Sequence, residues 1–162
     1  MTSVKFWRFL ALMLTAFSLS LSMAHLLEFP RRMLFERELW VRVTVIEGVY
    51  ALFGSVGAVF EVGAIAATFA VAYLVRRRRA AFYWTLGAGL VLLIALVSWI
   101  VFVNPANAEL ARWLTGPVPA DWTKTRDRWE YAHVVNALIK IAGAAALVIS
   151  VVRETPAERE KR

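Results

Sequence analysis

The sequence predicts an all-α integral membrane protein: a bundle of four transmembrane helices, with a short amphipathic helix in the second outer loop. Of its 162 residues 60% are hydrophobic, and the mean hydropathy of +0.59 is high for a soluble domain of this size. Four apolar segments reach or exceed the ~20 residues that cross a ~30 Å hydrocarbon core. Charged residues gather at the ends of these segments.

The four spans form one predicted domain, residues 1–152, followed by a cytoplasmic tail, 153–162, that we expect to be disordered. The predicted spans are Phe6–Leu27, Ile46–Val75, Ala81–Val103 and Tyr131–Val152. Pro30 is expected to end the first. A cleaved signal peptide over residues 1–24 is the alternative, but the apolar run there is about 20 residues, longer than the usual core of such a peptide.

The first outer loop and the second span come next. Residues Glu36–Arg42 suit a helix that runs into the second span, although the β-branched run at 43–46 also fits a short extended piece. Small residues at helical spacing give the second span a face that favours close packing in lipid, so this face should point inward. Its members are Gly54, Gly57, Ala58, Ala64, Thr68 and Ala72, with Glu61 among them.

The third span is mostly Leu, Val and Ile, with Trp84 and Trp99 as interfacial anchors. It should stop at Asn104-Pro105, and a short amphipathic helix over Ala106–Leu114 should then follow the membrane surface. Prolines turn the chain at 116–119. The last helix should begin with Asp121 as its N-cap and run unbroken into the fourth span.

Charge and cysteine content set the orientation and narrow the chemistry. The net charge of +7 would suggest nucleic acid in a soluble protein, but Arg76–Arg79 fills a short loop between two spans, where it acts as a topology signal. We therefore predict an inner or plasma membrane protein with both termini cytoplasmic, partnered by the lipid bilayer and by no nucleic acid. The sequence has no Cys, which excludes disulfides, thiolate metal sites and cysteine nucleophiles.

Two charged residues, Glu61 and Lys140, fall deep inside the spans. At 1.5 Å per residue, Glu61 lies roughly 21 Å and Lys140 roughly 18 Å from the cytoplasmic ends of their helices. Each would cost at least ~2.5–3.5 kcal/mol alone at mid-bilayer, so each needs a partner. The sequence predicts a Glu61–Lys140 ion pair, whose role is either to fix helix register or to take part in function.

Polar and aromatic residues also gather at the outer ends of all four spans and could form a pocket with apolar walls and a polar rim; the same residue types also serve as interfacial anchors. His133, as a base, and Asn136, Asn104 and Glu47, as orienting groups, are the candidate catalytic residues. The candidate substrate-binding residues are His25, Glu28, Tyr50, Trp99, Asn107 and Trp129.

A metal site and a nucleophilic serine are the other chemistries that the sequence could support at this pocket. His25-x-x-Glu28 and Glu130-x-x-His133 resemble parts of a carboxylate-bridged diiron bundle. That site needs Glu-x-x-His on two helices and a Glu on each of the others. Here one motif is reversed and the third span offers only amides, so we predict no metal. No serine elbow is present either, which leaves general acid–base chemistry by a histidine and a carboxylate.

Three motifs carry a family resemblance: AHLLEFP at 24–30, NPANAEL at 104–110 and RDRWEYAHVVNALIK at 126–140. With the four-span layout, they resemble the anthrone-oxygenase-like family of small integral membrane proteins. The resemblance implies oxidation of anthrones to anthraquinones by molecular oxygen, without a metal or flavin. Asn104, Asn107 and Trp129 match its pattern, whereas His133 and Asn136 stand where the family more often has Asn and Arg.

The leading hypothesis is a cofactor-independent oxygenase, or a related enzyme, acting on a lipophilic aromatic small molecule. The alternative is a non-enzymatic membrane component, either a small transporter subunit or a binding or assembly partner. One four-span protomer is small for a transport path and shows no inverted repeat, although a homo-oligomer could supply one. An enzyme should lose activity on His133→Ala, whereas a structural partner should tolerate changes in the pocket and copurify with another protein.

Overall fold

The computed structural model describes residues 3–48 and 51–154, and in these ranges all regular structure is helical. The first half of the chain forms α1 (Ser3–Arg32), α2 (Arg37–Thr44) and α3 (Ala51–Leu74). The second half forms α4 (Arg79–Ser98), the π-helix η1 (Trp99–Val103), α5 (Asn104–Arg112) and α6 (Trp122–Val152).

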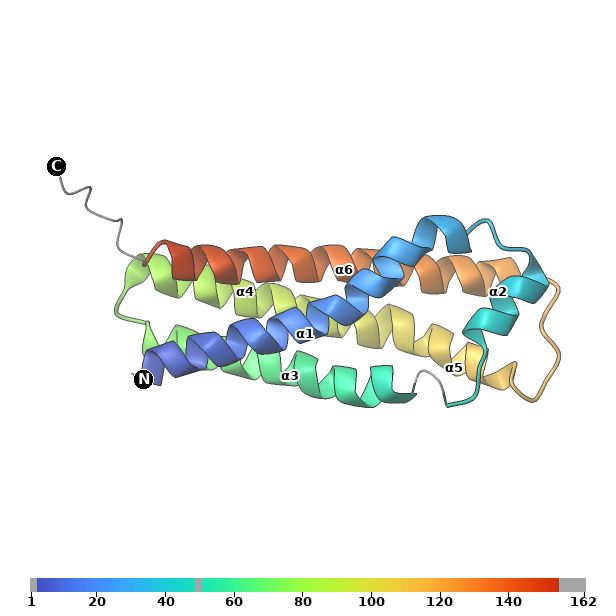
Figure 1. Cartoon of the computed structure of the whole chain (residues 1–162), viewed down its shortest axis with the longest axis horizontal. Coiled ribbons are helices and arrows are strands. Elements are labelled where there is room, and N and C mark those ends of the chain that lie inside the picture. Colours follow the sequence, from blue (N-terminus) through green and yellow to red (C-terminus); the bar gives the residue numbers. More distant parts are fainter. Residues whose placement is uncertain (1–2, 49–50, 155–162) are drawn as a thin grey trace.

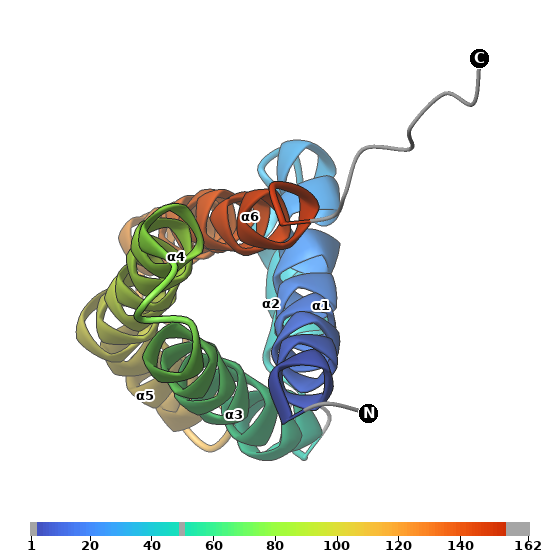
Figure 2. The ribbon, with the colours of Figure 1, turned by 90° about the vertical axis from the view of Figure 1, so that its left-hand side faces the viewer.

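Four long helices form a closed ring in which each packs against two neighbours. α1 packs on α3, α3 on α4, α4 on α6, and α6 back on α1, and Figure 2 shows this ring end-on. Successive helices run in opposite directions, so the start of α1 and the end of α6 lie at one end of the molecule, called here the termini end (Figure 1). The other end, where α2 and α5 lie, is called the α2 end.

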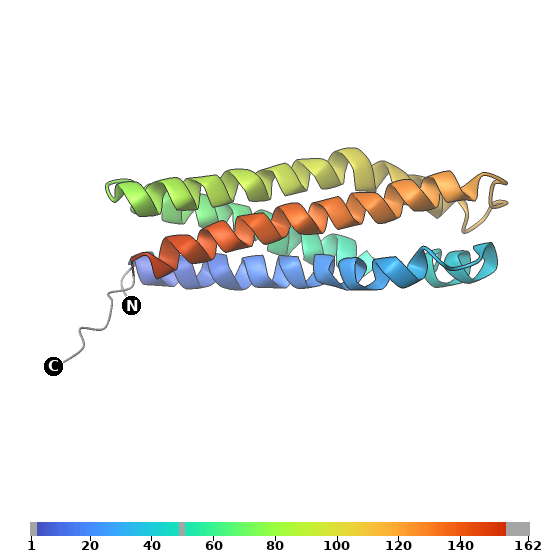
Figure 3. The same ribbon diagram turned by 90° about the horizontal axis from the view of Figure 1, so that it is seen from above.

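Four helical stretches in the described ranges are long and apolar enough to cross a membrane. They are residues 3–32, 53–74, 79–112 and 122–152. Figure 3 shows the long helices side by side along the molecule. At 1.5 Å per residue, the 34 residues of the third stretch extend about 51 Å, well beyond a ~30 Å hydrocarbon core. The chain is therefore an integral membrane protein built as a four-helix bundle.

The first helix extends beyond the predicted span. Pro30 lies inside α1, which continues to Arg32, so the prediction that this proline ends the helix is wrong. A proline removes one backbone hydrogen bond and crowds the carbonyl four residues earlier. Pro30 lies in the last turn of α1, so only one backbone hydrogen bond is lost. Only two more residues follow before the helix ends.

The connection between the first two spans also differs from the prediction. Residues 37–44 form a separate helix, α2, that does not run into the second span, and residues 45–48 are not helical. Gly48 has φ = 74°, a left-handed conformation that interrupts the path between the two helices. α3 therefore starts at Ala51 rather than at Ile46, and it is shorter than predicted.

The third span does not stop at Asn104-Pro105 as predicted. α4, η1 and α5 follow one another without a turn, and Pro105 occupies the first turn of α5. The π-helix directly before it has wider turns, and such segments accommodate a local interruption of the α-helical hydrogen bonds. The predicted surface helix is thus the continuation of the third span, displaced two residues toward the N-terminus.

The fourth helix runs unbroken from Trp122 to Val152, as the sequence predicts. Asp121 occupies the N-cap position but makes no capping hydrogen bond. Its carboxylate instead lies 3.1 Å from Lys124 Nζ. That contact and the positive charge of Lys124 hold the pKa of Asp121 below its usual value.

Candidate functional site: a cavity at the α2 end

A cavity of about 460 Å³ lies inside the ring, in the half of the bundle nearer α2. This volume falls within the ~300–1,000 Å³ typical of small-molecule sites. All four spans contribute to its lining, together with α5 and the segment that joins α2 to α3. The cavity therefore exists only in the assembled bundle.

One face of α6 supplies four lining residues. Trp129, His133, Asn136 and Lys140 follow at spacings of four, three and four, so they lie one above another along the helix. The sequence predicts that this face points inward. The structure places all four side chains along the cavity, from the α2 end to the middle of the bundle.

Two histidines from different helices meet in this cavity. The imidazole rings of His25 (α1) and His133 (α6) are stacked, with centroids 3.9 Å apart and planes 21° from parallel. The indole ring of Trp129 contacts both in edge-on geometry, at 4.4 Å from His133 and 5.1 Å from His25. The three rings thus form one aromatic cluster in the lining.

The ion pair expected in the membrane interior is present in the structure. Lys140 Nζ lies 2.9 Å from Glu61 Oε2, with the two side chains 7% and 11% exposed. The other carboxylate oxygen of Glu61 is buried and has no hydrogen-bond partner among the described residues. Both residues line the cavity at its deep end.

Amide groups tie the lining to the rest of the bundle. The Asn136 side-chain N–H donates to the Ala95 carbonyl at 2.6 Å, which also accepts from the Trp99 backbone N–H at the start of the π-helix. On α5, Asn107 accepts from the Trp129 indole N–H at 2.6 Å. The bond to Ala95 uses the side-chain nitrogen of Asn136, so the side-chain oxygen remains as a hydrogen-bond acceptor.

Three of the predicted site residues lie away from the cavity, and one falls outside the described residues. Asn104 is exposed at the start of α5, and Glu47 is exposed in the segment before α3; neither lines the cavity. The side chain of Glu28 is 59% exposed and lies 3.6 Å from Arg32. Tyr50 is not among the residues that the structure describes.

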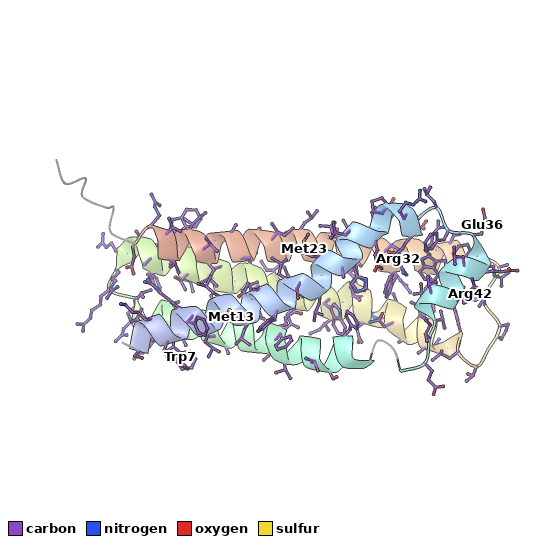
Figure 4. The ribbon with its side chains drawn as sticks, viewed as in Figure 1. Trp7, Met13, Met23, Arg32, Glu36 and Arg42 are labelled. Atoms are coloured by element: carbon purple, nitrogen blue, oxygen red, sulfur yellow. The ribbon has the colours of Figure 1, made fainter. Side chains whose placement is uncertain are left out.

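A buried network that the sequence does not predict lies directly beside the aromatic cluster. Arg32 donates to Glu130 at 2.8 Å and to Thr44 at 2.6 Å, and the Trp40 indole N–H also donates to Glu130, at 2.7 Å. Arg32 lies 5.3 Å from the Trp129 ring centroid. Figure 4 places Arg32 at the α2 end and Trp7 at the termini end.

The network fixes the position of α2. Trp40 is completely buried and packs with Trp113, Trp122 and Trp129. In the sequence Arg32 looks like an ordinary loop charge, because a basic residue near a membrane end usually stays in water. Trp40, the one aromatic residue within an amphipathic eight-residue helix, was the signal available in the sequence.

The donor groups around the cavity do not make a metal site. In residues 3–48 and 51–154, no three His, Asp or Glu side chains come close enough together to hold an ion. The lone pairs of an imidazole lie in its ring plane, so two rings stacked face to face do not aim their nitrogens at a common centre. The histidines of the two Glu/His motifs thus meet through their ring faces, while Glu28 and Glu130 both lie against Arg32.

The comparison with known families agrees with this architecture. A family model described as anthrone oxygenase matches residues 50–146, which is more than half of the 162-residue chain. The match covers α3, α4, η1, α5 and most of α6, and so includes most of the cavity lining. No curated protein and no solved structure gives a significant match. The chain belongs to the anthrone oxygenase family.

Proposed function

We propose that the protein is an enzyme that oxidises a lipophilic aromatic molecule with O₂, using its own side chains and no bound cofactor. The observation that carries this proposal is the stacked pair His25–His133 lining a cavity large enough for a small molecule. A base placed among apolar walls is what proton abstraction from a weakly acidic aromatic substrate requires. Membership in the family supports the same chemistry.

The proposed reaction starts with a proton transfer to His133. The base removes a proton from an activated ring methylene, and the electron pair left behind delocalises into the aromatic system. O₂ takes up the electrons and bonds to that carbon, and the proton held by His133 passes to the resulting peroxide. Loss of water then leaves a carbonyl, so that CH₂ and O₂ give C=O and H₂O: one oxygen atom enters the product and the other leaves as water.

The neighbouring residues have supporting roles in this proposal. His25 stacks on His133 and holds the ring in place, and the edge of Trp129 fixes both rings. We assign to the Asn136 oxygen the role of accepting a hydrogen bond from a substrate hydroxyl; Trp99 and Asn107 line the same cavity. Asn104 and Glu47 have no role in this proposal, because neither residue lines the cavity.

We further propose that the termini end faces the cytoplasm of an inner or plasma membrane. Arg76 to Arg79 lie at that end, between α3 and α4, and basic residues in short loops favour the cytoplasmic side. The cavity then opens toward the outer half of the bilayer. A substrate that partitions into lipid is concentrated where this site lies.

The test is oxygen consumption by the purified protein in lipid nanodiscs with 1,8-dihydroxyanthrone, measured above the spontaneous rate. Positioned acid–base groups contribute about 10²–10⁴-fold, so His133→Ala should lose at least about 100-fold while keeping the melting temperature. ¹⁸O₂ should label the new carbonyl. Tyr131→Phe on the exposed face of α6 is the matched control and should be unaffected.

Two results would overturn the proposal. One is O₂ uptake that His133→Ala does not change. The other is a protein with no turnover that copurifies with a second protein and tolerates changes in the cavity, which would favour a non-enzymatic membrane component.

A further inference from the structure

The two ends of the bundle carry very different charge. Among the described residues, the α2 end has eight basic and eight acidic residues, whereas the termini end has seven basic residues and a single acid, Glu154. Such an excess of positive charge attracts anions. The basic residues of the termini end, called here the basic surface, are Lys5, Arg8, Arg76, Arg77, Arg78, Arg79 and Arg153.

The basic surface is continuous across three parts of the chain. Glu154 forms ion pairs with Arg8 of α1 and with Arg78, so the ends of α1 and α6 meet the α3–α4 connection. This connection covers only residues 75–78, and the Arg78 backbone N–H donates to the Val75 carbonyl at 2.7 Å. A turn this tight holds its arginines directly beside the ends of two membrane spans.

Exposed aromatic rings indicate the depth of the basic surface in the membrane. Tyr73 lies near the end of α3 and Trp84 near the start of α4, and both are exposed. Arg76 lies 4.1 Å from the Tyr73 ring centroid, and Arg153 lies 6.0 Å from that of Trp84. Amphipathic rings of this kind settle at the level of the lipid headgroups. The guanidinium groups therefore lie in the layer that contains the lipid phosphates.

Two arginines of the basic surface have no partner within the described residues. Arg77 and Arg79 are exposed, and neither side chain forms an ion pair or a hydrogen bond with a residue in 3–48 or 51–154. Their role in setting topology concerns insertion and leaves their charge unneutralised in the folded protein. An anion from outside the described part of the chain is needed to balance them.

We propose that the basic surface binds the headgroup of an anionic phospholipid, with Arg77 and Arg79 on its phosphate. The planar guanidinium group donates two parallel hydrogen bonds to a pair of phosphate oxygens. Phosphatidylglycerol brings a net negative charge, which this surface lacks. Phosphatidylcholine carries its own ammonium group, so it adds a positive charge to a surface that is already basic. This site goes beyond the proposed function, since it lies at the end opposite the cavity and takes no part in the reaction.

The test compares phosphatidylglycerol with phosphatidylcholine of identical acyl chains, titrated onto the full-length protein in detergent micelles. Native mass spectrometry resolves each bound lipid, and we expect phosphatidylglycerol to bind at least about 10-fold more tightly. One basic residue near an anionic lipid surface contributes about fivefold in affinity. Arg77→Gln/Arg79→Gln should therefore weaken phosphatidylglycerol at least about 10-fold and change phosphatidylcholine little. Equal binding of the two lipids, or a preference for phosphatidylcholine, would overturn the proposal.

A charge-matched variant separates this surface from net charge. Arg31→Gln/Arg112→Gln removes two exposed arginines at the α2 end, neither of which is in an ion pair with a described residue, and it should keep the wild-type preference. The same loss of affinity in both double variants would contradict a site at the termini end.

The termini-end variant leaves the rest of the basic surface in place. Arg78 keeps its ion pair with Glu154 and Arg76 its contact with Tyr73, so the melting temperature without added lipid should match that of the wild type. Should the double variant fail to fold, Arg77→Gln alone makes the same test, with an expected loss of about fivefold in phosphatidylglycerol affinity. An unchanged affinity in a folded variant would refute the assignment of these arginines.

Discussion

The two halves of the bundle are built from the same four helices but are held together differently. At the termini end the helices meet through small and aliphatic side chains that are almost completely buried. Members of this core include Ala11, Ala67, Val71, Ala88 and Leu147. At the α2 end the contacts are ion pairs, indole hydrogen bonds and stacked rings, and the centre is hollow.

The contrast shows how a membrane bundle can keep a cavity open. Lipid gives helices no hydrophobic reason to associate, so close packing of small residues must supply the attraction. The α2 end has a hollow centre and therefore lacks this close packing. Directional contacts between long side chains replace it at the α2 end, and they hold the backbones apart at the same time.

The largest expected effect comes from breaking the network beside the cavity. Glu130→Ala leaves Arg32 buried without its buried carboxylate partner, and we expect a loss of roughly 3–5 kcal/mol in unfolding free energy. Denaturant titration in mixed micelles would measure it. The control is Asp121→Asn, which disturbs only an exposed pair with Lys124 and should change nothing measurable. A stable Glu130→Ala protein would show that the α2 end does not depend on this pair.

A somewhat smaller effect is expected in the middle of the bundle. Lys140→Met leaves the Glu61 carboxylate unpaired, and Glu61→Gln does the same to the amine. An isolated charge at this depth costs about 2.5–3.5 kcal/mol, so the yield of folded protein should fall for each. Exchanging the two residues should recover most of that yield. A double exchange that recovers none would argue against the pairing.

The same substitution in the two halves sharpens the comparison. A Cβ on Gly143 would lie 2.9 Å from Leu92 Cδ2, whereas one on Gly54 meets nothing. Gly143→Leu should therefore cost about 1–3 kcal/mol through overpacking. Gly54→Leu should leave the melting temperature unchanged and weaken ligand binding, because it fills the cavity. Equal destabilisation by Gly143→Leu and Gly54→Leu would show that the two halves of the bundle do not differ in packing.

The smallest effect is pH-dependent and lies at the termini end. Burial raises the pKa of the Glu154 carboxyl, but hydrogen bonds and charges from Arg8 and Arg78 outweigh burial and hold it below its ordinary 4.5. A lowered folded-state pKa means that the stabilisation is complete above pH 4.5 and is lost as the pH falls through the folded-state value.

Acid titration of the melting temperature would measure this contribution. We expect at most about 1 kcal/mol, present in the wild type and absent in Glu154→Gln. Identical acid profiles for the two proteins would contradict the expected role of this ion pair.

The fold and part of the site could be predicted from segment length, hydropathy and helical spacing. Segment length and hydropathy predict four spans because the bilayer imposes both. Helical spacing places Trp129, His133, Asn136 and Lys140 on one face, and depth along the helix pairs Lys140 with Glu61. The same spacing puts Ser18, Ser22 and His25 on one face of the first span.

The rest depended on tertiary contacts. Arg32 resembles any basic residue at a membrane end until Glu130, Thr44 and Trp40 are known to surround it. The sequence predicts Glu47 on a helix, because an apolar run gives no sign of where a helix begins, but it lies in the segment before α3. The π-helix has no sequence signature of its own.

Because of the π-helix at Trp99–Val103, the geometry of the site depends on the number of residues in this segment. A wide turn holds one residue more than an α-helical turn, so everything after it is rotated by about 100° relative to an unbroken α-helix. That rotation brings Asn107 to Trp129. Deleting one residue there, even the exposed Ile100, would turn Asn107 away from the cavity without altering any lining side chain. In this region, relatives with and without the extra residue would differ in site geometry more than relatives that differ in residue identity.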